Sequence, residues 1–184
     1  MEALEKLTIE LANAKVLNSK RLDQLKRKFC SETKFPLPQN SEILAAYRKL
    51  VATKKMQENQ TLEHFLIKRK IRTLSGVAPV AVLTKPYPCP GKCAYCPTEK
   101  EMPKSYLSNE PAVMRAMRSN FDPYKQTALR IEALEATGHI TDKIELIVMG
   151  GTFTHFPKKY QQWFVKRCFD ACNGKTSANL QVAQ

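Results

Sequence analysis

Apolar residues recur at steps of three to six positions along the first part of the chain, and basic residues lie between them. Spacing of this kind places apolar side chains on one face of a helix and charged side chains on the other. The pattern therefore predicts an amphipathic helix that ends at the two prolines of FPLPQNSE, residues 35–42. Its apolar positions are Leu4, Leu7, Leu11, Val16, Leu22, Leu25 and Phe29.

Two further helical segments are predicted before residue 77. Asn40 or Ser41 can cap the second helix, because short polar side chains accept hydrogen bonds from the free N–H groups of a first helical turn. A third helical pattern runs around residues 62–74 and ends in KRKIRTLSG. We therefore expect a helical domain over residues 1–76. The apolar face of its second helix comprises Ile43, Leu44, Tyr47, Leu50 and Val51.

The pattern changes at Val77. The stretches VAPVAVLT, residues 77–84, and KIELIVMGG, residues 143–151, are nearly continuous apolar runs of strand length, as expected for strands covered on both faces. Pro79 is tolerable near the start of the first strand. Helical sequence follows the first strand as SNEPAVMRAMRSNF and DPYKQTALRIEALEATGH, and a further helix is predicted from Pro157 to Gly174.

The helix between the strands has clear end signals. Asp122 can cap it, Pro123 fits its first turn, and Gly138 fits its end. Its predicted buried stripe is Tyr124, Ala128, Ile131 and Leu134.

The order strand, helix, strand, helix indicates an α/β fold with parallel strands joined by a right-handed crossover. Two strands and two helices cannot cover both faces of a parallel sheet or protect its edges. Residues 77–184 are therefore expected to be the first two βα units of a larger barrel or open sheet, joined to the helical domain of residues 1–76.

The net charge of the chain favours a polyanionic partner. Lys and Arg number 30 against 17 Asp and Glu, a formal net charge of +13, and residues 1–76 hold 16 Lys and Arg against 8 Asp and Glu. Such an excess attracts nucleic-acid phosphates. No stretch approaches about 18 apolar residues, and the charged, periodic start does not resemble a signal peptide. We therefore expect a cytoplasmic protein without a membrane segment, in which thiols stay reduced.

Three of the six cysteines lie in the proline-rich stretch KPYPCPGKCAYCP, residues 85–97, directly after the first predicted strand. In parallel α/β proteins the chemistry sits in the loops at the carboxyl ends of strands. The CxxxCxxC spacing of Cys89, Cys93 and Cys96 suits three thiolate ligands of an iron-sulfur cluster, with one iron left open for a small ligand. An iron-sulfur cluster is therefore favoured over a zinc site, unligated cysteines or disulfides.

Other interpretations of these cysteines remain. A zinc site would need a fourth ligand at no recognised finger spacing, and unligated cysteines would be poorly placed as core in a loop of prolines and lysines. Disulfides are disfavoured in a reducing compartment. The candidate fourth zinc ligands are Cys30, His64, His139 and His155.

The cysteine spacing, an aromatic residue before the last cysteine and a glycine pair at the end of the second strand resemble the radical S-adenosylmethionine superfamily. That resemblance implies a 4Fe-4S cluster on the three cysteines and S-adenosylmethionine on its open iron. It also implies that Tyr95 lies by the adenine and that Gly150, Gly151 and Thr152 contact the cofactor. Glycines permit the close backbone approach this requires.

Longer segments resemble the Elongator catalytic subunit family, the radical-SAM tRNA carboxymethyluridine synthases. These are FPLPQNSEILAAYRKL, RTLSGVAPVAVLTKPYPCPGKCAYCP, SYLSNEPAVMRAMRSNFDPYKQTALRIEALEATGH and DKIELIVMGGTF. The resemblance implies a partial radical-SAM, TIM-like barrel. It also implies acetyl-CoA-dependent carboxymethylation of the wobble uridine of tRNA, a reaction of the acyltransferase class. No catalytic residue is assigned apart from the cluster ligands.

The family resemblance also implies further binding residues. Lys143 matches a lysine associated with acetyl-CoA, although its sequence context alone suggests a solvated residue before a strand. The basic helical region corresponds to the tRNA-binding part of the family, and Lys85 and Lys92 flank the cysteines. The candidate tRNA contacts, which could equally be a solvated helix face, are Lys68, Arg69, Lys70 and Arg72.

The family continues into the rest of the barrel and an acetyltransferase-like domain, neither of which matches a segment of this sequence. We therefore expect a truncated or split member that does not complete the reaction alone. Two alternatives are a non-catalytic tRNA-binding module and an interaction subunit of a tRNA-modifying assembly with Elongator-like subunits.

Overall fold

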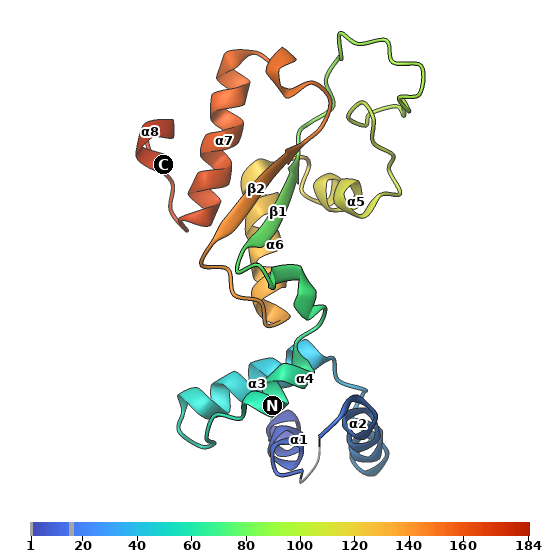
Figure 1. Cartoon of the computed structure of the whole chain (residues 1–184), viewed down its shortest axis with the longest axis vertical. Helices are drawn as coiled ribbons and strands as arrows, with labels where there is room; N and C mark the ends of the chain where they lie inside the picture. Colours follow the sequence, from blue (N-terminus) through green and yellow to red (C-terminus); the bar gives the residue numbers. More distant parts are fainter. Residues whose placement is uncertain (1, 15–16) are drawn as a thin grey trace. The chain divides into compact units, whose positions relative to one another are not determined.

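The structure, a computed structural model, describes residues 2–14 and 17–184. Val16, counted above in the first apolar pattern, lies outside these residues. The chain forms two compact units. The helical unit comprises residues 1–76 and 133–140, and the strand unit comprises residues 77–132 and 141–184. Figure 1 colours the elements of both units along the sequence.

The helical unit contains α1 (Glu2–Ala12), α2 (Ser19–Thr33), α3 (Asn40–Ala52) and α4 (Gln60–Leu66). The prediction of a single helix up to the prolines was wrong, because a new helix starts at Ser19. Asn18 caps α2, and its side-chain oxygen accepts a hydrogen bond of 2.8 Å from the Arg21 N–H. The apolar steps near this point exceed the 3.6-residue helical repeat, which is consistent with the break. The buried apolar core of the unit is Leu7, Leu11, Leu22, Leu25, Phe29, Ile43, Leu44, Tyr47, Leu62 and Leu66.

The start of α3 differs from the predicted cap. The cap residue is Gln39, whose backbone N–H donates to Glu42 Oε2 at 2.6 Å. Asn40 is already helical, and its side-chain oxygen accepts a hydrogen bond of 3.1 Å from Lys26 Nζ. The predicted apolar face is confirmed for its first four members, which are buried, while Val51 is half-buried.

The third predicted helix is shorter than expected. Helix α4 ends at Leu66, and Arg69 has a φ of 53°, in the left-handed region, which cannot continue a right-handed helix. A short 3₁₀ turn, η1 (Lys70–Thr73), then leads to the strand unit. The apolar side chains of Ile71 and Leu74 in this segment are exposed.

Residues 133–140 pack within the helical unit. The predicted glycine at the helix end is confirmed, since Gly138 has a φ of 91° and the His139 N–H closes the turn on the Leu134 carbonyl at 3.0 Å. A Cβ on Gly138 would lie 3.0 Å from Leu44 Cδ2, so glycine also permits close packing on α3. His139 is buried, with its Nδ1 2.9 Å from Thr73 Oγ1.

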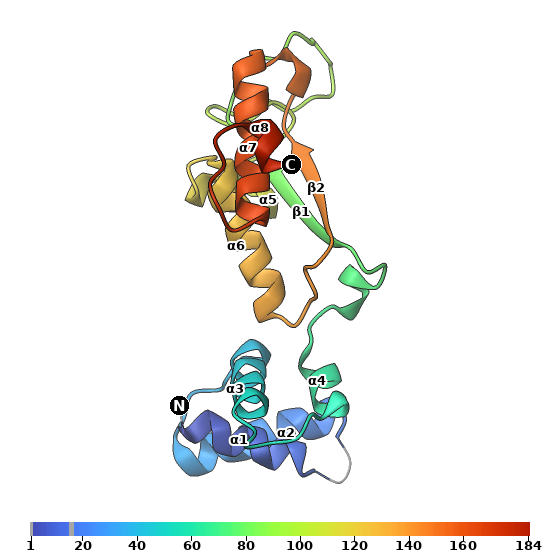
Figure 2. The same cartoon turned by 90° about the vertical axis from the view of Figure 1, so that its left-hand side faces the viewer.

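The strand unit is built on two parallel strands, β1 (Ala78–Leu83) and β2 (Ile144–Met149), paired from Ala78 with Ile144 to Leu83 with Met149. Figure 2 shows the helices of this unit on one side of the strands. The predicted α/β class with a parallel strand pair is confirmed. The remaining elements are α5 (Pro111–Arg118), α6 (Pro123–Ala136), η2 (Phe153–His155), α7 (Lys158–Cys172) and α8 (Leu180–Ala183).

The two strands differ in burial. In β1, Ala78, Val80, Val82 and Leu83 are buried. In β2, no residue is buried, and Ile147 and Val148 are 39% and 36% exposed. The prediction that both strands are covered on both faces was therefore wrong for β2. An apolar sequence indicates a capacity for burial, whereas packing of the helices decides which strand is covered.

Helix α6 starts as predicted, with Pro123 as its first residue and Asp122 Oδ1 accepting from the Lys125 N–H at 2.8 Å. Its predicted buried stripe is only partly correct: Leu134 is buried and the other three members are half-buried. The polar residues Gln126 and Thr127 are buried instead.

Gln126 occupies the outer edge of β1. Its Oε1 accepts from the Leu83 N–H at 3.0 Å, and its Nε2 donates to the Leu83 carbonyl at 2.9 Å. One side-chain amide thus replaces the two backbone bonds that a neighbouring strand would supply. This pairing protects the end of the strand from which the cysteines continue.

No helix among residues 2–14 and 17–184 has the length and apolar character needed to cross a membrane.

Candidate iron-sulfur and cofactor site

Two segments leave the carboxyl ends of the paired strands and meet there. The cysteine loop, residues 85–97, follows β1, and the glycine turn, residues 150–152, follows β2. Because Leu83 pairs with Met149, the two segments start side by side. The Thr84 N–H extends the pairing by donating to the Met149 carbonyl at 2.9 Å. This end of a parallel sheet is where α/β proteins place ligands.

Cys89 is the cysteine that contacts the glycine turn. Its Sγ lies 3.6 Å from Thr152 Oγ1. A hydrogen bond with the Gly91 backbone lowers the pKa of the Cys89 thiol, and the Thr152 side chain lowers it further. The charge of Lys104 acts in the same direction. A lowered pKa favours the thiolate, the form that binds metal ions and iron-sulfur clusters.

Cys93 and Cys96 complete the sequence-predicted thiol set. A Cβ on Gly91 would lie 3.7 Å from both Cys89 Sγ and Cys93 Sγ, so these two sulfurs flank one position on the loop. The Cys96 N–H donates to the Cys93 carbonyl at 3.2 Å and closes a turn between them. Within the described ranges, however, no three His, Cys, Asp or Glu side chains form a ready metal-binding group. The donor set fits cluster ligation in its chemistry, with two of the three thiols beside Gly91.

The glycine turn requires glycine at its first position. Gly150 has a φ of 147°, and a Cβ there would overlap Thr84 Oγ1 and lie 3.2 Å from Thr84 Cβ. A Cβ on Gly151 would lie 4.0 Å from Cys89 Cβ and 3.6 Å from Lys104 Cβ. The backbone of the turn therefore runs against the cysteine loop, with Gly151 and Thr152 beside Cys89 and Gly150 against Thr84.

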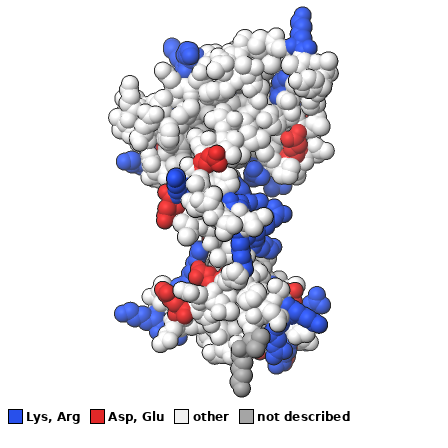
Figure 3. Space-filling model, viewed as in Figure 1, with Lys and Arg blue, Asp and Glu red and all other residues white. Residues whose placement is uncertain are grey.

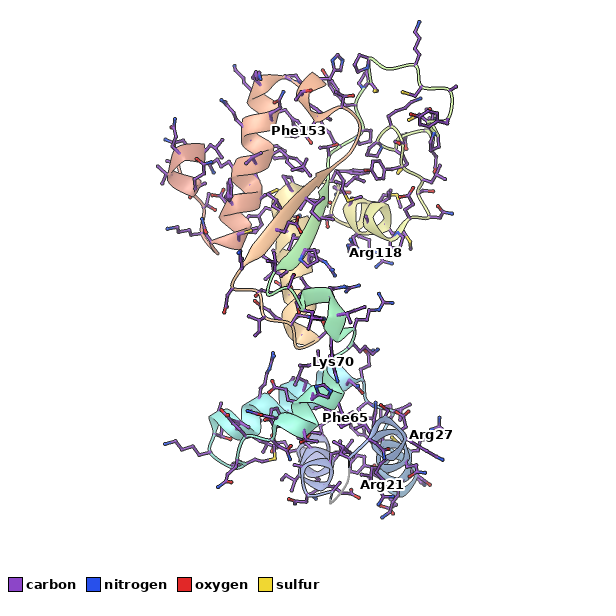
Figure 4. All side chains as sticks on the ribbon, viewed as in Figure 1. Arg21, Arg27, Phe65, Lys70, Arg118 and Phe153 are labelled. Atoms are coloured by element: carbon purple, nitrogen blue, oxygen red, sulfur yellow. The ribbon has the colours of Figure 1, made fainter. Side chains whose placement is uncertain are left out.

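Aromatic side chains hold the start of the cysteine loop against α7. Tyr87 stacks on Phe156 with ring centroids 4.4 Å apart, and Phe156 stacks on Tyr160 at 4.6 Å. The Lys85 N–H donates to the Tyr160 hydroxyl at 3.2 Å, and the Lys85 ammonium lies 4.9 Å from the centre of that ring. Burial raises the pKa of Tyr160. Figure 4 labels Phe153, which belongs to the same cluster because its ring lies 6.2 Å from that of Phe156.

Sequence reasoning missed Thr84, Lys104, Gln126 and Tyr160 as neighbours of this site. Thr84 carried a usable signal. It is the one polar residue of the apolar run at residues 77–84 and stands at its carboxyl end, where ligands bind. The other three approach through tertiary packing and had no comparable local signal.

Two predicted site residues, Tyr95 and Lys143, are not packed against the thiols. Tyr95 is in the cysteine loop, but its side chain is 92% exposed. Lys143 is exposed, and its carbonyl accepts from the Ala78 N–H at 2.8 Å, at the amino end of the strand pair. The length of β2 places it about 20 Å from the glycine turn at the usual rise per residue. The structure therefore does not bring Lys143 to the cysteines.

The four candidates for the fourth ligand of a zinc site are divided between the two units. Cys30, His64 and His139 belong to the helical unit. His155 belongs to the strand unit, where its ring lies 5.9 Å from that of Tyr87, near the start of the cysteine loop.

The candidate tRNA contacts lie between α4 and β1, because the helix predicted over residues 62–74 ends at Leu66, and Lys70 and Arg72 belong to the short η1. Lys68 and Arg69 are exposed, and Lys70 lies over the Phe65 ring at 5.4 Å (Figure 4). Figure 3 shows Lys and Arg side chains gathered around this segment. Burial is the main cause that lowers the pKa of nearby Lys26, and the charge of Lys68 acts in the same direction. The segment is therefore a local concentration of positive charge.

Comparison with known proteins gives homologues over nearly the whole chain, although no protein-family model matches it. The tRNA uridine(34) acetyltransferase of Methanocaldococcus infernus is 46% identical over 189 residues, covering 98% of this chain and 34% of that protein. Elongator complex protein 3 of Homo sapiens is 41% identical over 145 residues, covering 73% of this chain and 26% of that protein.

A similar solved structure is that of the archaeal Methanocaldococcus infernus Elp3 with residues 1–46 deleted. It is 44% identical, covers 59% of this chain and 18% of that chain, and superposes with a TM-score of 0.43.

The fold and the site define an α/β protein that carries a thiol-bearing loop and a glycine turn at the carboxyl ends of two parallel strands. The level of identity identifies the family. The chain belongs to the family of Elongator complex protein 3 and the tRNA uridine(34) acetyltransferases, and it spans about a third of the length of the relatives it matches.

Proposed function

We propose that this chain is the cluster-bearing part of a radical S-adenosylmethionine enzyme that modifies uridine 34 of tRNA. The names of its relatives support the tRNA substrate and the acetyltransferase chemistry, and hence acetyl-CoA as a co-substrate. The carrying observation is the contact of Cys89 with Thr152, 63 positions apart in sequence, which joins the cysteine loop to the glycine turn.

Each element of the site has a role in this proposal. Cys89, Cys93 and Cys96 hold a 4Fe-4S cluster through their thiolates. The backbone of Gly150 and Gly151 approaches the amino-acid end of S-adenosylmethionine, Thr152 orients Cys89, and Tyr95 lies by the adenine. The bound cofactors supply the radical chemistry, while the protein orients them and excludes water.

The remaining parts of the proposal concern the rest of the chain. Residues 77–184 are the first two βα units of a radical-SAM partial barrel, and residues 1–76 bind tRNA. Lys143 is the proposed acetyl-CoA contact by its family resemblance, although its backbone pairs with Ala78 at the amino end of the strands, away from the thiols. We expect this chain, located in the cytoplasm, not to complete the reaction without the further parts that its relatives carry.

Anaerobic reconstitution with iron and sulfide tests the cluster. The 184-residue chain should turn brown, with thiolate-to-iron absorbance and about four irons per chain. Replacement of Cys89, Cys93 or Cys96 by Ala should abolish the absorbance.

Cys30→Ala is the matched control, because Cys30 is a half-buried thiol of the helical unit. This variant should keep the iron and the colour of the parent. A colourless parent chain that retains zinc would contradict the proposal, and loss of zinc in His155→Ala would then identify the fourth zinc ligand.

A second candidate is a tRNA-binding module without catalysis. The concentration of Lys68, Arg69, Lys70 and Arg72 on one turn, together with the excess of basic residues in residues 1–76, favours it. Phosphate binding by such a segment depends strongly on salt, because each contact releases counterions.

Charge removal in the intact chain tests this candidate. Replacing Lys68, Arg69 and Arg72 by Ala should weaken tRNA binding and lower the salt slope by about one for each lost phosphate contact. Replacing Arg21 and Arg27, which are exposed on α2 (Figure 4), is the control and should have a smaller effect. Equal tRNA affinity with and without a cluster would favour the binding module over the enzyme.

A further inference from the structure

One face of α7 carries residues that the proposed function does not use. Lys159, Gln162, Trp163 and Lys166 stand at steps of three and four positions, so they lie on the same side of the helix. Helix α8 lies beside α7 in both views (Figures 1 and 2), and the two helices border an open groove of about 540 Å³ within the strand unit. The other side of the groove is lined by Asn179, Leu180, Gln181 and Gln184.

Hydrogen bonds fix α8 and the segment before it to α7. Fully buried Asp170 accepts from Lys166 Nζ at 2.8 Å and from the Ser177 N–H at 2.9 Å. Asn173 Nδ2 donates to the Ala183 carbonyl at 2.7 Å, and Ala183 is buried. Packing of α8 onto α7 therefore holds both sides of the groove in place.

The lining of the groove suits a flat, anionic ligand. Trp163 is 42% exposed, although its ring packs against Tyr160 with the ring centroids 5.6 Å apart. Its indole therefore gives the groove an apolar surface, beside residues that carry side-chain amides. No Asp or Glu of the described residues lines the groove. Lys166 is paired with Asp170, whereas Lys159 is exposed and forms no ion pair with a residue that the structure describes.

RNA matches this lining better than an acidic peptide does. A nucleobase stacks on an aromatic ring, and such stacking stabilises the binding of single-stranded RNA. Amide side chains hydrogen-bond with base edges, and a lysine ammonium binds phosphate. An acidic peptide would use the lysines but would leave the indole without a planar partner. The formal net charge of +13 of the chain also favours nucleic acid.

We propose that the groove between α7 and α8 binds an unpaired nucleotide of the tRNA substrate, with its base stacked on Trp163 and a phosphate at Lys159. The nucleotide is unpaired because the faces of a base within a duplex are already covered by its neighbours. The inference rests on the proposed function. It adds an RNA contact in the strand unit to the basic segment of residues 68–72.

The fluorescence of Trp163 reports on this groove alone, because Trp163 is the single tryptophan of the 184-residue chain. Titration with tRNA should quench this fluorescence and protect the indole from acrylamide, since a stacked base covers it. Filter binding measures the dissociation constant in parallel. Trp163→Ala should weaken tRNA binding about tenfold, whereas Trp163→Phe, which keeps a stacking ring, should stay within about threefold of the parent.

Two lysine variants test the phosphate contact without changing the apolar packing. Lys159→Gln should lower the salt slope of tRNA binding by about one. Lys158→Gln is the matched control, because Lys158 is an exposed neighbour on α7 that does not line the groove. This control should keep the slope of the parent. Melting curves from circular dichroism show whether each variant is folded, so that a lost contact is separated from a lost fold.

Three results would overturn the inference. If tRNA binds Trp163→Ala as tightly as the parent and leaves the parent fluorescence unchanged, the groove is not an RNA site, while the proposed function stands. Quenching by polyglutamate but not by tRNA would assign the groove to an acidic protein partner. If the parent binds no tRNA, the inference and the tRNA-binding part of the proposed function both fail, and the colour of the reconstituted chain tests the cluster independently.

Discussion

The helical unit and the strand unit use burial in different ways. The helical unit packs leucines such as Leu7, Leu44 and Leu62 to complete burial. The strand unit holds both buried hydroxyls without partners found in the described part of the chain, and it exposes Cys93 at its strand ends. One unit is thus packed around an apolar core, and the other combines an apolar core with these two open hydroxyls, one of which, that of Thr84, lies beside the glycine turn. Four changes test this separation, in order of decreasing effect.

Leu44→Ala should have the largest effect. Leu44 is 1% exposed and packs in the core of the helical unit. The cavity should lower the free energy of unfolding by about 3 kcal/mol, measured by denaturant titration with circular dichroism. Leu37→Ala, at a side chain that is 62% exposed, should change it by less than about 0.5 kcal/mol. Loss of iron binding in Leu44→Ala would show that the units are not separate in function.

Gly150→Ala should destabilise the strand unit by about 2 kcal/mol, because the new Cβ overlaps Thr84 and the backbone is strained. Gly174→Ala is the control, since Gly174 also has a positive φ, of 63°, but no atom within 4 Å of a Cβ. The control should lose only the backbone strain, about 1 kcal/mol. Equal losses in thermal unfolding would refute the Thr84 contact.

Gln126→Leu should cost about 1.5 kcal/mol, because the N–H and carbonyl of Leu83 lose their partners at the edge of β1. The same replacement at exposed Gln162 is the control and should be nearly neutral. Hydrogen exchange at the Leu83 amide should accelerate only in the first variant. An unchanged exchange rate would contradict the edge pairing.

The smallest effect is expected in a pH profile. Asp170 is fully buried, and its hydrogen bond with Lys166 Nζ, at 2.8 Å, lowers the carboxyl pKa below its ordinary value. A lowered pKa means that the folded state favours the charged form. The stabilisation of the fold by the charged Asp170 carboxylate is complete above the ordinary pKa of an aspartate. It is lost as the pH falls through the lower pKa of the folded state.

Thermal unfolding between about pH 5 and pH 2.5 should therefore show a steeper loss of stability in the parent than in Asp170→Asn. Exposed Asp142→Asn is the control and should keep the slope of the parent. Identical slopes for all three chains would contradict the role of Asp170.

Local sequence signals predicted the elements around the site well. The apolar run before the cysteines is β1, the run before Gly150 is β2, and Asp122, Pro123 and Gly138 bound α6 as expected. These signals act over a few residues, through cap hydrogen bonds, fixed φ angles and strand-length apolar runs. Predictions failed where neighbours distant in sequence compete: Asn40 bonds Lys26 instead of capping its helix, and β2 is half-exposed.

The sequence by itself determined the parallel strand pair, the thiol set at the end of its first strand and the basic character of the helical region, since composition and short-range spacing carry that information. The tertiary structure alone decided that Cys89 meets Thr152, that Gln126 closes the edge of β1 and that Thr84 is buried without a partner. The physical reason is distance along the chain. Hydrogen bonding and burial between segments some 40 to 70 residues apart depend on how the helices pack, which no local pattern encodes.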